Sequence, residues 1–227
     1  MNVFLYILDT LADWEIGYLI AEINSGRYLK KNIEKPQIIK VGKNLNPIKT
    51  MGGMEITPNI DVQKIKMYKD DLLILPGADA WLNKNNDEIL NFVKENIEKD
   101  ITIAAICGAT IALANYGLLN KKKHTSNDLG FLKMVCPNYK GERYYLNQHV
   151  VTENNLITAT GIAPLEFAYE VLKKINIMER NVIEAWYNLF KTKESKYFLE
   201  LMESLKKSNI SKKGLGNNYD ARTNISV

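Results

Sequence analysis

Apolar runs alternate with helical patterns along the first 190 residues of the chain. Short stretches of consecutive aliphatic residues predict buried strands, whereas apolar residues spaced three or four positions apart predict helices. Such an alternation is typical of a parallel sheet that helices cover on both faces. We therefore predict an α/β fold of the doubly wound, flavodoxin-like type, with a mostly parallel sheet.

The predicted strands and helices follow one another in a regular order. The strands cover residues 3–8, 37–41, 71–75, 101–106, 149–152 and 156–160. The helices cover residues 11–24, 87–98, 108–116, 164–174, 180–190 and 193–207. Short extended pieces flank Gly52-Gly53 and predict a hairpin. The stretch 101–106 is the most apolar, so we expect it in the interior of the sheet.

Three parts follow from this pattern. Residues 1–190 form the α/β domain, residues 191–207 add a C-terminal helix, and residues 208–227 form a polar tail that we expect to be mobile. The helices beyond residue 180 carry an aromatic and leucine stripe that must cover the body or a second subunit. We expect it to cover the body.

Composition narrows the class of protein. The chain is 46% hydrophobic and 25% charged, as in ordinary globular proteins. Residues 191–227 hold eight of the 30 basic and four of the 26 acidic residues, so residues 1–190 are neutral overall. A neutral domain predicts no nucleic-acid partner.

The start of the chain has no basic leader, and no apolar run approaches the roughly 20 residues that span a bilayer. We expect a cytoplasmic protein without a membrane partner.

Cysteine and histidine are scarce. Two of each are too few for a disulfide framework and make a structural zinc site unexpected. We predict no metal and no cofactor. Cys136, which precedes Pro137, is interpreted as structural.

Cys107 stands where the most apolar strand meets a helix of small residues. Gly108, Ala109 and Ala112 let the chain turn tightly and let the helix pack close to the sheet. The cysteine is then held at the carboxyl end of a strand, facing helix N–H groups that favour a thiolate. The alternative is a buried cysteine that acts as a small apolar residue.

Two other segments could meet Cys107. The turn Leu75-Pro-Gly-Ala78 ends the preceding strand, and the N–H groups of Gly77 and Ala78 could bind an oxyanion; the alternative is a plain strand-ending turn. Glu15 follows the first strand and could share a proton with the thiol, which would raise the pKa of its carboxyl. The alternative is an exposed acid in the first helical turn.

Taken together, these features resemble the PfpI/DJ-one superfamily, whose members share the class I glutamine-amidotransferase-like fold. Six blocks in the family's order carry the resemblance: residues 12–15, 71–78, 104–110, 117–119, 123–127 and 156–168. The resemblance implies that Cys107 is the nucleophile and that Glu15 is the acid hydrogen-bonded to its sulfur. It implies backbone N–H donors at Gly77, Ala78 and Gly108. It also implies a homodimer.

The usual histidine bases of the family are missing. Protease-like members place a histidine directly after the cysteine, where this chain has Gly108. Other members place one where this chain has Asn127, after Thr-Ser, and the region 161–166 lacks the histidine of glutaminase domains. Asn127 and His124 remain as auxiliary candidates, although we expect His124 to be a packed or interfacial residue. His149 is expected at an edge or on the surface.

Three functions fit these residues. The first is a cysteine-dependent hydrolase or amidase, or a glyoxal-directed enzyme, acting on a small molecule. The second is a non-catalytic, redox- or stress-responsive protein that senses an oxidant through Cys107. The third is a glutaminase subunit of an amidotransferase, which the missing histidine disfavours.

Overall fold

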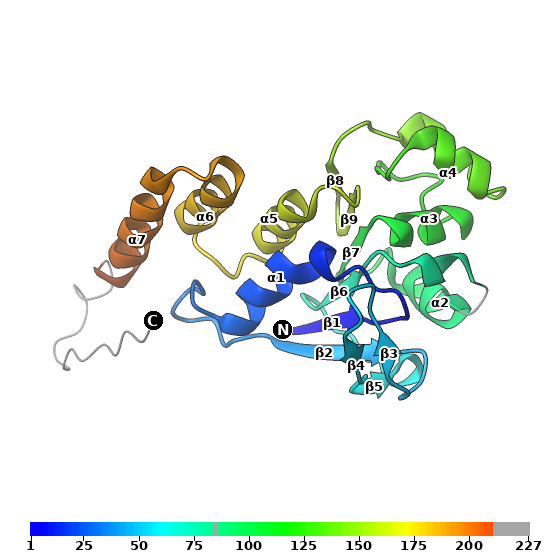
Figure 1. Cartoon of the computed structure of the whole chain (residues 1–227), viewed down its shortest axis with the longest axis horizontal. Coiled ribbons are helices and arrows are strands. Elements are labelled where there is room, and N and C mark those ends of the chain that lie inside the picture. The colour runs from blue at the N-terminus through cyan, green and yellow to red at the C-terminus, as the bar shows by residue number, and fades with distance from the viewer. Residues whose placement is uncertain (84–85, 211–227) are drawn as a thin grey trace.

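One seven-stranded sheet organises the chain, and the computed structural model describes residues 1–83 and 86–210 of it (Figure 1). The strand order is β5-β2-β1-β6-β7-β9-β8, and all neighbours are parallel except β8 and β9. The strands are β1 (Asn2–Tyr6), β2 (Gln37–Gly42), β5 (Ile60–Asp61), β6 (Leu72–Leu75), β7 (Thr102–Ile106), β8 (Val150–Glu153) and β9 (Leu156–Ala159). The predicted doubly wound α/β fold is confirmed.

Helices cover both faces of this sheet (Figure 1). One apolar cluster joins the sheet to α2 (Asp87–Asn96), α3 (Gly108–Asn115) and α4 (Leu129–Val135). The other joins it to α1 (Asp13–Ser25), α5 (Pro164–Ile175) and α6 (Arg180–Thr192). Side chains alternate along the strands: Leu73 and Leu75 of β6 enter the first cluster, and Leu72 and Ile74 enter the second. This two-residue period explains why the inner strands are apolar throughout.

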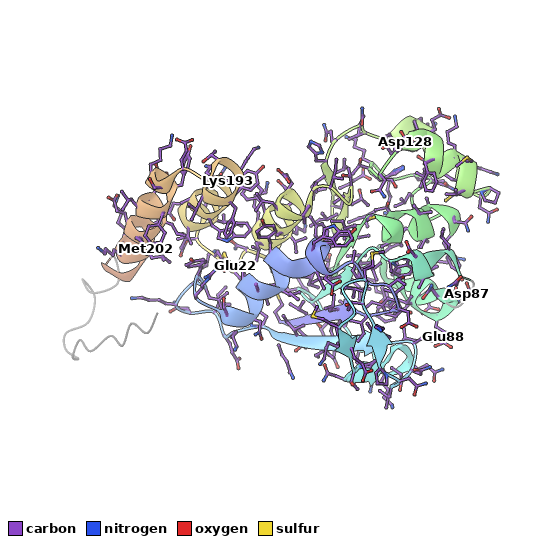
Figure 2. All side chains as sticks on the ribbon, viewed as in Figure 1. Glu22, Asp87, Glu88, Asp128, Lys193 and Met202 are labelled. Atoms are coloured by element: carbon purple, nitrogen blue, oxygen red, sulfur yellow. The ribbon has the colours of Figure 1, made fainter. Side chains whose placement is uncertain are left out.

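Smaller elements complete the fold. The predicted hairpin is present as β3 (Ile48–Lys49) and β4 (Glu55–Ile56). Among the described residues, the 3₁₀ helices η1 (Val62–Lys64), η2 (Asp79–Leu82) and η4 (Glu142–Tyr144) and the strand β5 were not predicted, whereas α4 occupies a helix-like stretch of the sequence that ends at Cys136. These elements are too short for a periodic pattern to identify. The start of α4 is fixed instead by Asp128, labelled in Figure 2, whose side chain accepts a hydrogen bond from Phe131 N at 2.7 Å.

The strand order places a crevice beside the first strand. From β1 the chain moves outward to β2 and β5, then crosses back to β6 and continues to β7, β8 and β9 on the other side, where β9 lies between β7 and β8. The direction of winding therefore reverses between β1 and β6. In open α/β sheets, ligands bind at the carboxyl ends of the strands next to such a reversal. The segments that follow β1, β6 and β7 meet at this edge.

Two helices extend the fold at one end of the sheet (Figure 1). Helix α6 packs on α5, and α7 (Ser195–Ile210) packs mainly on α6. Part of the predicted apolar stripe is covered, since Trp186 and Leu201 are fully buried, whereas Phe198 remains exposed. Of the predicted polar tail, residues 211–227 lie outside the described residues. No helix in the described ranges has the length and apolar character that crossing a membrane requires.

A buried carboxylate joins this extension to the body. Glu22 lies on the side of α1 that faces α6 (Figure 2) and is 2% exposed. Its oxygens accept hydrogen bonds from the guanidinium of Arg27 and, at 3.0 Å, from the indole Nε1 of Trp186. The carboxylate charge of Glu22 is thus paired with Arg27, and the buried indole N–H of Trp186 has a hydrogen-bond acceptor.

We predict that Glu22→Ala lowers the free energy of unfolding by about 2–3 kcal/mol, because the buried indole N–H is left without an acceptor and the Arg27 ion pair is lost. Urea denaturation followed by fluorescence measures the change. The matched control is Glu34→Ala, which removes an exposed glutamate and should change stability by less than about 0.5 kcal/mol. Equal effects of the two substitutions would contradict this role of Glu22.

Candidate functional site

Cys107 occupies a sharp turn between β7 and α3. Its backbone has φ 57° and ψ −123°, a positive φ that a residue with a Cβ rarely adopts. The turn is fixed on both sides: Cys107 N donates to Ala159 O of β9 at 2.9 Å, and Thr110 N donates to Cys107 O at 3.0 Å. The side chain is half-buried. The predicted strand-to-helix turn is therefore present, and it presents the sulfur at the carboxyl edge of the sheet.

Two glycines make room for the sulfur and its acidic neighbour. A Cβ at Gly161 would lie 2.7 Å from Cys107 Sγ and 3.0 Å from Glu15 Oε1. A Cβ at Gly77 would lie 2.3 Å from Glu15 Oε2 and 2.8 Å from Cys107 Cβ. A side chain at either position would therefore displace the Cys107 or Glu15 side chain. This role of Gly161 was not predicted from the sequence, although the residue lies just beyond a buried strand and within the block of residues 156–168.

Glu15 points into the molecule from the first turn of α1. It is 1% exposed, and its Oε2 accepts a hydrogen bond from Gly77 N at 2.7 Å. Ala12 N in turn donates to Gly77 O at 2.9 Å, which ties the start of α1 to the turn after β6. Glu15 is therefore not the exposed acid of the alternative interpretation.

The hydrogen bond to Glu15 changes the expected set of oxyanion donors. Gly77 N already donates to the carboxyl, so this N–H is not available to a substrate oxygen. A Cβ at Gly108 would lie 3.3 Å from Ala78 N and 2.8 Å from Ala78 O, which shows that the two segments approach closely. The N–H groups of Ala78 and Gly108 remain as the candidate donors.

The thiol and the Glu15 carboxyl compete for one proton. Burial and the nearby Glu15 carboxylate raise the pKa of the Cys107 thiol to about 11, and burial raises the pKa of Glu15. Two adjacent buried anions repel each other, so ionisation of one group disfavours ionisation of the other. An ionised Glu15 therefore disfavours the thiolate form of Cys107.

The surrounding donors favour the other placement of this proton. Glu15 Oε1 is buried, and within the described residues no N–H or O–H group donates to it. The sulfur, by contrast, accepts a hydrogen bond from Asn127 Nδ2 at 3.2 Å and lies at the start of α3. A proton on Glu15 Oε1 satisfies that oxygen and leaves a thiolate with a donor of its own.

Asn127 is the auxiliary candidate that reaches the thiol. While Nδ2 donates to Sγ, Oδ1 accepts a hydrogen bond from Gly161 N at 2.8 Å, which fixes the orientation of the amide. This hydrogen bond to the sulfur lowers the pKa of Cys107, opposing the larger effect of burial. The segment around Asn127 is irregular.

The two histidines serve elsewhere. His124 is fully buried, and its ring nitrogens form hydrogen bonds with Lys122 O at 2.7 Å and with the Tyr139 hydroxyl at 2.8 Å. Burial lowers the pKa of His124. It is therefore the packed residue that we expected, and its nitrogens are not directed at Cys107. His149 is exposed, and Cys136 is buried with its Sγ 3.4 Å from Ile111 O.

A pocket of about 210 Å³ opens above the sulfur. Glu15, Gly77, Ala78, Gly108 and Asn127 line it together with Cys107, so the site residues predicted from the sequence converge there, except His124. A larger pocket of about 370 Å³ opens beside Asp9 and Lys43 and does not include the thiol. Nowhere in the described ranges do three histidine, cysteine or acidic side chains gather as a metal site requires.

Comparisons with known proteins identify relatives of the whole domain. The model of the DJ-1/PfpI family matches residues 1–174. A protein of Bacillus subtilis (strain 168) named "Uncharacterized protease YoaZ" is 48% identical over 204 residues, which cover 90% of this chain and 97% of the relative. Another from the same organism, "Uncharacterized protease YdeA", is 36% identical over 171 residues, 75% of this chain and 81% of the relative.

Solved structures agree with these matches. A thiJ/pfpI family protein from Bacillus anthracis superposes with a TM-score of 0.88 and is 50% identical, covering 89% of this chain and 96% of that one. The DJ-1 superfamily protein Atu0886 from Agrobacterium tumefaciens is 28% identical, with a TM-score of 0.72, and covers 85% of this chain and 99% of its own length.

We predict that Asn127→Leu slows the alkylation of Cys107 by iodoacetamide about tenfold at pH 7. A hydrogen bond to a charged group contributes about 1.5 kcal/mol, and the loss of that energy corresponds to about a tenfold change in rate. The amide stabilises the thiolate, so its loss raises the pKa of Cys107 and reduces the thiolate fraction at every pH below that value. Intact-mass spectrometry in a Cys136→Ser background follows the reaction. Asn147→Leu changes an exposed asparagine and should leave the rate unaltered; an unaltered rate for Asn127→Leu would refute the role of the amide.

Proposed function

Because the chain belongs to the DJ-1/PfpI family, we propose that it is a cysteine-dependent enzyme in which Cys107 adds to the carbonyl carbon of a small molecule. The observation that supports this most directly is the pairing of a half-buried thiol with a buried carboxyl, because the two share one proton beside an open pocket. The substrates would be small amides or reactive aldehydes such as glyoxals.

The proposed reaction begins with attack by the Cys107 thiolate. Sγ forms a bond to the carbonyl carbon, and the electron pair of the C=O bond moves to the oxygen. The N–H groups of Ala78 and Gly108 stabilise this oxygen while the charge develops. With a glyoxal, the Glu15 proton passes to the oxygen and gives a hemithioacetal. The Glu15 carboxylate then moves the proton of the hemithioacetal carbon to the neighbouring carbonyl carbon, and water hydrolyses the resulting thioester to a 2-hydroxy acid and the free thiol. With an amide, the Glu15 proton passes to the departing amine, and water then hydrolyses the thioester.

A peptide substrate is disfavoured by the missing histidine base, although two relatives carry the word protease in their names. Peptide hydrolysis needs a base that activates water as well as an acid for the amine. Gly108 and Asn127 stand where other members of the family have a histidine. General acid–base catalysis contributes typically about 10²–10⁴-fold, so a site with Glu15 alone should hydrolyse peptide bonds, like other amides, slowly, and reactive aldehydes are the favoured substrates.

We predict that Cys107→Ser abolishes the turnover of methylglyoxal or of a small amide, whereas Cys136→Ser, the matched control, retains it. Glu15→Gln should reduce turnover by about 10²–10⁴-fold, because an amide can donate a hydrogen bond to the sulfur but cannot transfer a proton. Glutamine and methylglyoxal are assayed in parallel with the purified full chain. Turnover that persists in Cys107→Ser would exclude the proposed enzyme.

A second candidate function is oxidant sensing, and the same thiol favours it. A thiolate that attacks hydrogen peroxide forms sulfenic acid and releases water, and the Asn127 amide and the Glu15 carboxyl could hydrogen-bond the added oxygen. The absence of a histidine at Gly108 and Asn127 is compatible with this chemistry, which needs no second base.

For this candidate we predict that mild peroxide adds one or two oxygen atoms to Cys107 and leaves the buried Cys136 unmodified. Peptide mass spectrometry locates the added mass. Selective oxidation without any Cys107-dependent turnover would favour the sensor over the enzyme. Equal oxidation of both cysteines would count against the sensor.

A further inference from the structure

The mouth of the Cys107 pocket carries large apolar side chains that face water. Trp14 is 55% exposed, Met51 42%, Leu82 67% and Phe131 40%, and all four line the pocket. They come from α1, the turn between β3 and β4, η2 and α4, segments that lie far apart in the sequence. Single exposed apolar residues are common on proteins, but four around one opening mark a binding surface.

The charges around this pocket have one sign. Glu15 and Asp79 line it, and its lining among the described residues contains no lysine, arginine or histidine. An anionic ligand would meet two carboxyl groups and no compensating cation in a partly desolvated space. A free amino acid such as glutamine would leave its carboxylate unpaired there.

We infer that the Cys107 pocket selects neutral molecules that carry an apolar, ring-sized group next to the reacting carbonyl, and that it discriminates against anions. This inference rests on the proposed function, since it names the substrate class of the same thiol. A cavity of about 150 Å³ can hold benzene. The 210 Å³ here accommodate one ring above the sulfur, and the four exposed side chains cover its outer edge.

The test uses three alkylating agents with the same reactive group. Iodoacetamide is small and neutral, iodoacetate is anionic, and N-benzyl iodoacetamide is neutral with a ring. Each rate at Cys107, measured by intact mass in the Cys136→Ser background, is divided by the rate of the same agent with glutathione. We expect the benzyl reagent to exceed iodoacetamide about tenfold, and iodoacetate to fall about tenfold below it.

Substitutions at the pocket mouth locate the source of the preference. The double variant Leu82→Gln with Phe131→Gln should reduce the benzyl preference to about threefold or less. Leu199→Gln alters a leucine of α7 with similar exposure, 62%, and should leave the preference intact. Asp79→Asn should raise the rate of iodoacetate relative to iodoacetamide about threefold.

The outcomes separate the two proposals. Equal normalised rates for the three agents, or a preference for iodoacetate, would overturn the selectivity while leaving Cys107 as a nucleophile. Failure of all three agents to label Cys107 would overturn the proposed function and the selectivity together. The same side chains could instead form a subunit interface, and sedimentation of the Leu82/Phe131 variant tests this role. If the variant dissociates from a dimer while the benzyl preference persists, the side chains belong to an interface and the inference is overturned.

Discussion

The positive φ of Cys107 is the constraint on which the site depends. A residue with a Cβ held in such a conformation costs roughly 1–3 kcal/mol, so its surroundings must enforce it. Here the enforcement comes from the ends of β7 and β9, through the bond from Cys107 N to Ala159 O, and from the first turn of α3, through Thr110. The strained residue is therefore held between strand ends and the first turn of a helix. The position of the thiol does not depend on a mobile loop.

A second constraint follows from crowding around this turn. Gly77 and Gly161 approach so closely that the sulfur and the Glu15 carboxyl lie side by side. The charge on one group therefore disfavours a charge on the other. The retained proton is both the reason that the thiolate is costly and the proton that a reaction at a carbonyl requires.

Much of this arrangement could be predicted from the sequence, because it follows from strong local patterns. Aliphatic runs identified the inner strands, and small residues after Cys107 identified the turn. The destination of the Gly77 N–H could not be predicted, since it depends on how far the start of α1 leans over the end of β6. The hydrogen bonds of Asn127 could not be predicted either. An irregular segment has no regular alternation of buried and exposed residues from which the direction of a side chain could be inferred.

Helix α7 is attached to the fold in a different way from the edge of the sheet that carries Cys107. It packs mainly on α6, which is itself anchored through Trp186 and Glu22, whereas the Cys107 turn is held by the central strands. Stability within one protein is distributed unevenly, and peripheral elements open at lower free energy than the core. Amide hydrogens of α7 should thus exchange with solvent deuterium well before those of β7, and the last helix can fray while the sulfur keeps its place.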